Sequence, residues 1–212
     1  MEQLSIIPAR EQVAAALRKA IFEGELHPGQ ELTQDEIAQK LGISRMPVRE
    51  AFQMLERDGL LLLKKRKAIV QGQTEEDFID HYDIRALLEG EAAARAALNK
   101  HNLPAIIHAQ QSVEIAAQSN DASGYQQANE SFHRSVWRAS ESTRLENLLN
   151  QLWTGLPPHL PELLPEQIVK SIDEHHGIVD AIANGSSEQA RTAMVAHVKR
   201  SLTDLLQSRS RR

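Results

Sequence analysis

The chain has 212 residues and a mass of 23.7 kDa, with 41% hydrophobic and 25% charged residues. This composition is typical of globular proteins and argues against disordered, collagen-like and low-complexity chains. The absence of cysteine excludes disulfides, thiolate metal sites and cysteine nucleophiles. No apolar run approaches the roughly 18–20 residues that span a bilayer, and the N-terminus lacks the pattern of a secretory signal. We therefore expect a soluble, cytoplasmic protein without a membrane partner.

The net charge of −5 is unevenly distributed along the chain. Residues 1–72 carry 11 basic and 10 acidic residues, whereas residues 73–212 carry 13 basic and 19 acidic ones. Within residues 37–70, eight basic residues stand against three acidic ones, and eight of the nine histidines follow residue 72. A basic patch favours a polyanionic partner, and a histidine-rich region favours a ligand site.

The first 72 residues predict three helices followed by a β-hairpin. The predicted elements are a helix over 9–23, a second between Thr33 and Gly42, a third from Ser44 to about Asp58, and strands over 60–64 and 68–71. Thr33 and Glu36 have the spacing of a capping box, and the second helix is expected to turn Leu41 inward. The tight turn at Gly42 reverses the chain between two packed helices. This order of elements is the layout of a winged helix-turn-helix.

The third helix of such a domain enters the major groove by its N-terminal end. Here that end reads Ser44-Arg45-Met46-Pro47-Val48-Arg49. Arg45 and Arg49 are four residues apart and share one face, and arginine suits bidentate contact with guanine. Ser44 and the free amides of the helix start suit a phosphate. The hairpin tip, expected to follow the DNA backbone or minor groove, consists of Lys64, Lys65, Arg66 and Lys67.

A simpler interpretation of both groups of basic residues remains open. The arginines of the third helix would then form a solvated face, and the basic tip would keep an edge hairpin soluble. For either group taken alone, DNA contact and a solvated surface explain the basic residues equally well. The order of all the elements together favours DNA binding.

After residue 72 the sequence predicts only helices. They are expected over 74–99, 103–119, 122–139, 143–156, 165–184 and 187–207. The fold class is therefore mainly α, with an N-terminal winged helix-turn-helix over residues 1–72. An all-helical bundle of about six helices would form the second domain over residues 73–212.

Four side chains of this bundle have the spacing of a metal site: Asn129, His133, His175 and His197. Asn129 and His133 lie four residues apart on one helix face, and His175 and His197 lie on consecutive helices joined by a short turn. Three imidazoles and one amide oxygen from three helices could surround a divalent cation such as zinc. Alternatively, each histidine is a polar core or surface residue.

The N-terminal stretch closely resembles the GntR family of bacterial transcription regulators. The resemblance rests on the sequence ALRKAIFEGELHPGQELTQDEIAQKLGISRMPVREAFQMLERDGLL. It implies a DNA-binding dimer on a short, closely spaced inverted repeat. The chain departs from the family pattern at Met46, where a threonine is common, and at Lys67, where a glycine is common. The first change favours an apolar base contact, and the second favours non-specific affinity over insertion into the minor groove.

The remainder resembles the FCD effector-binding domain of the FadR subfamily, with a length closer to its VanR-like group. The resemblance rests on DHYDIRALLEGEAAARAA, NESFHRSVW and EHHGIVDAIANGSSEQARTAMVAHV. It implies that His133, His175 and His197 are metal ligands and that Asn129 replaces a usual aspartate. A neutral amide predicts weaker binding of a zinc or nickel ion, the ions that imidazole ligands favour.

The family resemblance also implies a role for Arg85. In the family's helix, the arginine of the sequence Arg85-Ala86-Leu87-Leu88-Glu89 often holds the carboxylate of a small acidic metabolite. Pairing with Glu89 along the helix is the alternative.

The sequence therefore predicts a DNA-binding transcription regulator, expected to be a repressor and not an enzyme. Its helical domain would bind a small carboxylate metabolite and a divalent metal. Two alternatives remain open: a regulator that acts without an effector, and a metalloenzyme built on the histidines. The second lacks an H-E-x-x-H motif and a general base, and it leaves the N-terminal domain unexplained.

Overall fold

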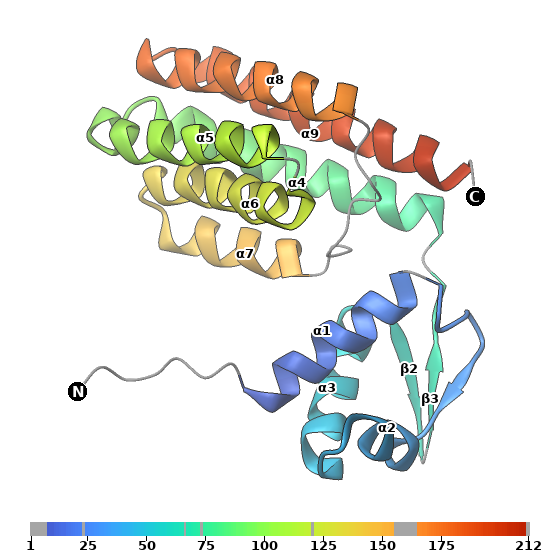
Figure 1. Cartoon of the computed structure of the whole chain (residues 1–212). Coiled ribbons are helices and arrows are strands. Elements are labelled where there is room, and N and C mark those ends of the chain that lie inside the picture. The colour runs from blue at the N-terminus through green and yellow to red at the C-terminus, as the bar shows by residue number, and fades with distance from the viewer. Residues whose placement is uncertain are drawn as a thin grey trace. The chain divides into compact units, whose positions relative to one another are not determined.

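The computed structural model describes residues 8–22, 24–65, 67–72, 74–119, 121–154 and 165–210. The chain folds into two compact units, Met1–Thr74 and Glu75–Arg212. Figure 1 shows the helices and strands of the described residues along the chain. The sequence had indicated a boundary after residue 72, at the end of the hairpin.

The first unit is a winged helix-turn-helix, as the sequence predicted. Its elements are α1 (Ala9–Phe22), β1 (Glu31–Leu32), α2 (Gln34–Leu41), α3 (Arg45–Arg57), β2 (Leu61–Lys64) and β3 (Lys67–Val70). The sheet is antiparallel with the order β1-β3-β2, and α3 packs against α1, α2 and β2. Strand β1 was not predicted, because two residues are too few to show an alternating pattern.

Local signals set the two ends of α2. The Thr33 side chain accepts a hydrogen bond from the backbone N–H of Glu36, and the Glu36 carboxylate accepts one from the backbone N–H of Thr33. These two bonds complete the predicted capping box. Gly42 ends the helix at a φ of +66°, a left-handed conformation that glycine adopts without strain. The expectation for Leu41 was wrong, since its side chain is 41% exposed at the end of the helix.

The second unit consists of helices in its described residues. They are α4 (Glu75–Ala96), the short 3₁₀ helix η1 (Lys100–Asn102), α5 (Leu103–Gln118), α6 (Ala122–Ala139), α7 (Thr143–Thr154), α8 (Pro165–Ala183) and α9 (Ser187–Ser210). The six α-helices confirm the predicted all-helical bundle. None of the helices in the described part of the chain is long and apolar enough to cross a bilayer.

Helix α4 is the centre of this bundle. It packs against α6, α7, α8 and α9, while α5 packs against both α6 and α8. The contact between α4 and α9 is close at Gly90, where an added Cβ would lie 2.7 Å from Val195 Cγ2. This arrangement brings residues of α4, α5, α6, α8 and α9 together in the interior of the bundle (Figure 1).

Candidate functional site

The four residues predicted to contact DNA from the recognition helix are all exposed at the start of α3: Ser44, Arg45, Met46 and Arg49. Ser44 is the N-cap residue, in an extended conformation, and its hydroxyl makes no capping hydrogen bond. Arg45 forms an ion pair with Asp35 of α2, and Arg49 Nη2 lies 3.3 Å from Met46 Sδ. The structure thus presents these side chains to solvent on one helix end.

The predicted basic tip lies at the turn between β2 and β3. Lys64 is opposite Lys67 in the register of the hairpin, and both are exposed, as is Lys65. Lys67 forms an ion pair with Glu31, whose carboxylate raises the pKa of the lysine. Arg66 lies outside the described residues. One of the tip cations is therefore partly neutralised within the protein.

His133, His175 and His197 form a buried cluster between α6, α8 and α9. One ring nitrogen of each lies within 4.8 Å of the others, and the side chains are 1%, 0% and 3% exposed. His133 Nε2 and His197 Nε2 are 3.3 Å apart. Two nitrogens bound to one tetrahedral zinc ion, each ~2.0–2.1 Å from it, lie ~3.3–3.4 Å apart. The cluster therefore has the spacing of a metal site.

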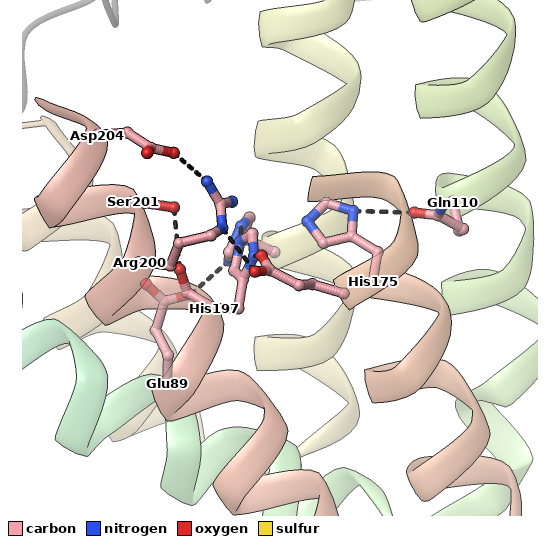
Figure 2. Close-up of polar contacts among 9 residues, drawn as sticks. Glu89, Gln110, His175, His197, Arg200, Ser201 and Asp204 are labelled. Carbon is pink, nitrogen blue, oxygen red and sulfur yellow. Dashed lines mark hydrogen bonds and ion pairs between the residues drawn. The ribbon is translucent and has the colours of Figure 1, made fainter. Parts of the chain in front are cut away.

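The other ring nitrogen of each histidine is bound by an oxygen. His133 Nδ1 lies 2.6 Å from Glu89 Oε2, and His197 Nδ1 lies 2.8 Å from Glu174 Oε2. His175 Nδ1 lies 2.9 Å from Gln110 Oε1, and Figure 2 shows these two side chains pointing toward one another. Because carboxylate and amide oxygens accept, each Nδ1 carries the proton. In the neutral form of each ring, Nε2 is left with its lone pair.

Burial favours the neutral form of His175 and His197. It lowers the pKa of His175 well below 6.5, and the neighbouring His197 and His133 add to this effect. Burial also lowers the pKa of His197 to about 4, against the opposing effect of Glu174. The neutral imidazole with a bare nitrogen is the form that binds a metal ion.

Glu89 is the most buried charged residue of the site. Burial raises the pKa of its carboxyl, but Arg85, His133 and the hydrogen bond from Trp137 Nε1 lower it more strongly, to about 2. Arg85 reaches Glu89 Oε1 with Nε at 2.9 Å and Nη2 at 2.8 Å. Its guanidinium also lies over the rings of Tyr82 and Trp153. In this structure Arg85 makes the pairing with Glu89 that the sequence left as the alternative to an effector contact.

Two buried polar atoms in this region have no hydrogen-bond partner among the described residues: Asn129 Oδ1 and His175 Nε2. Tyr125, Asn129 and His133 follow one another at four-residue intervals on α6 and so share one face. A cation would satisfy both the amide oxygen and the imidazole nitrogen. These orphaned atoms and the set of donors fit a divalent metal ion.

Sequence patterns did not identify Glu89, Gln110 and Glu174 as site residues. Glu89 is 44 residues from His133, and Gln110 is 65 residues from His175, so no local spacing links them. The only usable signals were the four-residue interval between Arg85 and Glu89 and the position of Glu174 next to His175.

Comparisons with known proteins agree with both units. A family model described as bacterial regulatory proteins, gntR family, matches residues 9–70, and one described as FCD domain matches residues 80–200. The protein named probable D-xylose utilization operon transcriptional repressor of Paenarthrobacter nicotinovorans is 32% identical over 88% of this chain and 84% of its own length.

Solved structures show the same fold. Escherichia coli McbR/YncC superposes with a TM-score of 0.75 at 23% identity, over 96% of this chain and 99% of that one. A GntR transcriptional regulator from Rhodococcus sp. RHA1 gives a TM-score of 0.68 at 27% identity, over 93% and 97% of the two chains.

Proposed function

Because the chain belongs to the gntR family of bacterial regulatory proteins and carries an FCD domain, we infer that it is a DNA-binding transcriptional regulator. We propose that its histidine cluster is a metal centre through which an acidic metabolite controls DNA binding. One observation carries this proposal: three buried histidines hold one ring nitrogen each within 4.8 Å of the others, while an oxygen binds the Nδ1 atom of each ring. The comparisons point to regulators and not to enzymes, so the metalloenzyme alternative is not favoured.

The recognition helix supplies the proposed DNA contacts. Arg45 and Arg49 would contact bases, Met46 would contact an apolar base edge, and Ser44 would bind a phosphate. We propose that two copies of the chain bind the two halves of a short inverted repeat. A single recognition helix buries too little surface for specific affinity, and a two-fold operator requires a two-fold protein.

Four residues would hold the ion: Asn129, His133, His175 and His197. Imidazole nitrogens favour zinc, nickel or copper over magnesium, so we propose zinc or nickel. The bound ion would supply positive charge for an anionic ligand. The buried Tyr125, one helical turn from Asn129, would donate a hydrogen bond from its hydroxyl to a carboxylate of that ligand.

The effector role of Arg85 stays a prediction. The Arg85 side chain is 6% exposed and is bound by Glu89, so an effector carboxylate would have to share or replace that contact. We therefore propose Tyr125, in addition to Arg85, as a candidate contact of the effector, a small carboxylate metabolite.

Operator binding measured with and without metal tests the proposal. The full chain would be titrated against its operator after chelation, after reloading with Zn²⁺ or Ni²⁺, and with a panel of small carboxylates added. We expect a carboxylate to shift operator affinity in the metal-loaded wild type and not in His175→Ala. If the operator affinity of the wild type changes neither with metal nor with carboxylates, the protein acts as a regulator without an effector. This outcome contradicts the proposal.

A further inference from the structure

Two hydrogen-bonded chains of side chains lead to the histidine cluster, and each consists of an arginine, a glutamate and a histidine. In the first, Arg85 holds Glu89 Oε1, and Glu89 Oε2 lies 2.6 Å from His133 Nδ1. In the second, Arg200 Nε lies 2.6 Å from Glu174 Oε1, and Glu174 Oε2 lies 2.8 Å from His197 Nδ1. Each carboxylate thus divides its two oxygens between one arginine and one histidine.

The two chains come from different parts of the bundle. Arg85 and Glu89 are on α4, whereas Glu174 is on α8 and Arg200 is on α9. They meet where His133 and His197 bring their Nε2 atoms to 3.3 Å from each other. Local helix spacing accounts for the pair on α4 but not for the second pair, which is 26 residues apart in sequence. The feature that the two sets share is therefore a carboxylate that binds the Nδ1 atom of a histidine in the cluster.

The third histidine has a neutral partner. His175 Nδ1 is bound by the amide oxygen of Gln110, whose own amide nitrogen donates to Glu114 at 3.2 Å. A carboxylate bound to Nδ1–H makes an imidazole a stronger metal ligand and fixes its orientation, and an amide oxygen fixes orientation with less electronic effect. The neighbouring carboxylates would therefore make two of the three imidazoles, those of His133 and His197, stronger metal ligands.

We propose that Glu89 and Glu174 are positioning residues that provide, beyond the ligands themselves, the negative charge that Asn129 does not bring to the metal centre. They hold His133 and His197 with Nε2 bare and aimed at the ion. Arg85 and Arg200 orient the two carboxylates. This proposal rests on the metal centre described above, and it explains how a set of four neutral ligands retains a divalent cation.

The burial of Glu89 argues against a purely structural pair. Its side chain is 0% exposed, and removing a carboxylate from water costs several kcal/mol, which an ion pair with one arginine often fails to recover. The second oxygen makes two further bonds, to His133 and to Trp137 Nε1 at 3.1 Å. An ion pair between α4 residues alone would not require this second set of contacts.

The test compares two changes that each remove one carboxylate from Arg200. Glu174 binds both Arg200 and His197, whereas Asp204 binds Arg200 and, in the described part of the chain, forms no hydrogen bond with a histidine of the cluster. Figure 2 shows Arg200 reaching Asp204. Glu174→Gln and Asp204→Asn therefore change the net charge equally. Arg200 keeps one acidic partner in each variant, so both are expected to fold.

The affinity of the full chain for Zn²⁺ and Ni²⁺ would be measured by competition with a chromogenic chelator. We expect Glu174→Gln to lose about 10–100-fold in affinity, the range found for groups that orient metal-bound histidines, and Asp204→Asn to stay close to wild type. The melting temperatures of the metal-free proteins show whether folding is retained. For the first chain, the paired variant Arg85→Met/Glu89→Gln leaves no buried arginine unpaired and should lose affinity over the same range.

Distinct outcomes overturn the proposal and the metal centre. Equal affinities of Glu174→Gln and wild type, or equal losses in Glu174→Gln and Asp204→Asn, overturn the positioning role and leave the metal centre standing. Failure of the wild type to bind either ion overturns the metal centre and this proposal together. ¹⁵N NMR of the metal-free wild type must show His133 and His197 protonated on Nδ1, and protonation on Nε2 also overturns the positioning role.

Discussion

The side chain of Arg85 carries a positive charge into the interior of the bundle, where the carboxylate of Glu89 pairs with it. Breaking a buried ion pair by removing one partner leaves the other charge uncompensated. The nearby pair Arg95–Glu91 is on the same helix at the same spacing, but its side chains are 48% and 33% exposed. Glu91 also pairs with Arg191, so Arg95→Leu leaves it with a cation, and the Arg95–Glu91 pair serves as the exposed control.

We expect Arg85→Leu to lower the free energy of unfolding by about 3–5 kcal/mol, because Glu89 would stay buried without its cation. Arg95→Leu, the exposed control, should cost less than about 1 kcal/mol. Urea denaturation of the metal-free proteins measures both. If Arg85→Leu keeps wild-type stability and loses only its response to a carboxylate, then Arg85 is the effector contact and not the support of Glu89.

His81, a partly buried residue, is a second side chain with a consequence for stability. Its Nε2 has no hydrogen-bond partner among the described residues, and burial, aided by Arg85, lowers its pKa to about 4. The unfolded chain takes up this proton near pH 6.5, whereas the folded chain resists it until about pH 4. This residue therefore favours folding above pH 6.5, and that contribution is lost as the pH falls toward 4.

Replacement of His81 by glutamine should remove this acid sensitivity. Between about pH 7 and about pH 4 the wild type is expected to lose on the order of 3 kcal/mol more unfolding free energy than His81→Gln. Chemical denaturation at the two pH values gives the difference. Parallel losses in both proteins would show that His81 is protonated in the folded state as readily as in the unfolded one.

At the scale of elements, the hairpin and the recognition helix should affect DNA binding differently. Arg49→Ala removes an exposed side chain at the start of α3 and should cost about 1–3 kcal/mol and relax base preference. Lys64→Ala and Lys65→Ala should weaken binding to every sequence and each reduce the salt slope by about one. Lys67→Ala should have a smaller effect, since Lys67 is paired with Glu31.

Electrophoretic or fluorescence titrations over a range of salt concentrations separate these effects. An Arg49→Ala variant that binds the operator as the wild type does would contradict the assignment of α3 as the recognition helix. A salt slope that changes equally for Lys64→Ala and Lys67→Ala would show that Glu31 releases Lys67 when DNA binds.

The close packing of α4 against α9 predicts opposite effects for two helical glycines. Alanine normally stabilises a helix interior by about 0.5–1 kcal/mol relative to glycine. At Gly177 of α8 an added Cβ meets nothing within 4 Å, so Gly177→Ala should stabilise. At Gly90 the Cβ would lie 2.7 Å from Val195 Cγ2, and the overpacking should cost about 1–3 kcal/mol. Thermal unfolding of both variants checks the contrast, and stabilisation by Gly90→Ala would contradict it.

Most helix ends were predictable because short-range signals mark them. The capping box of Thr33 and Glu36 begins α2, Pro165 begins α8, and α6 has the predicted bounds Ala122–Ala139. Strand β1 escaped prediction because it exists only through pairing with β3, more than 30 residues later. Local chemistry thus determines where helices begin and end, and long-range pairing determines the edge strand.

For the candidate site, the clustering of the three histidines was predictable, and the residues that bind their Nδ1 atoms were not. Helix spacing placed Asn129 beside His133, and the turn between α8 and α9 made His175 and His197 neighbours. The partners of the Nδ1 atoms come from helices that pack beside these histidines, and no periodicity indicates which acid lies there. A glutamate such as Glu89 looks like a solvated helical residue until the packing of α4 buries it.

At the scale of the whole molecule, the chain combines a DNA-binding unit with a helical unit that has one buried polar centre. The helical unit carries most of the acidic residues and eight of the nine histidines, and the histidines with bare Nε2 atoms lie in its interior. Burying this many polar groups is costly unless each finds a partner. A metal ion is the single partner that would satisfy the three imidazoles and Asn129 together.

The metal content of the purified chain tests this account most directly. After dialysis without chelator, the wild type should hold about one zinc or nickel ion per chain, and His175→Ala or His197→Ala should hold none, since each removes one of few ligands. Asn129→Asp, which adds a charged ligand, should retain the ion against a stronger competing chelator than the wild type does. Equal, near-zero metal in the wild type and in Asn129→Asp would contradict the account, because the buried histidines would then serve the core or bind the effector directly.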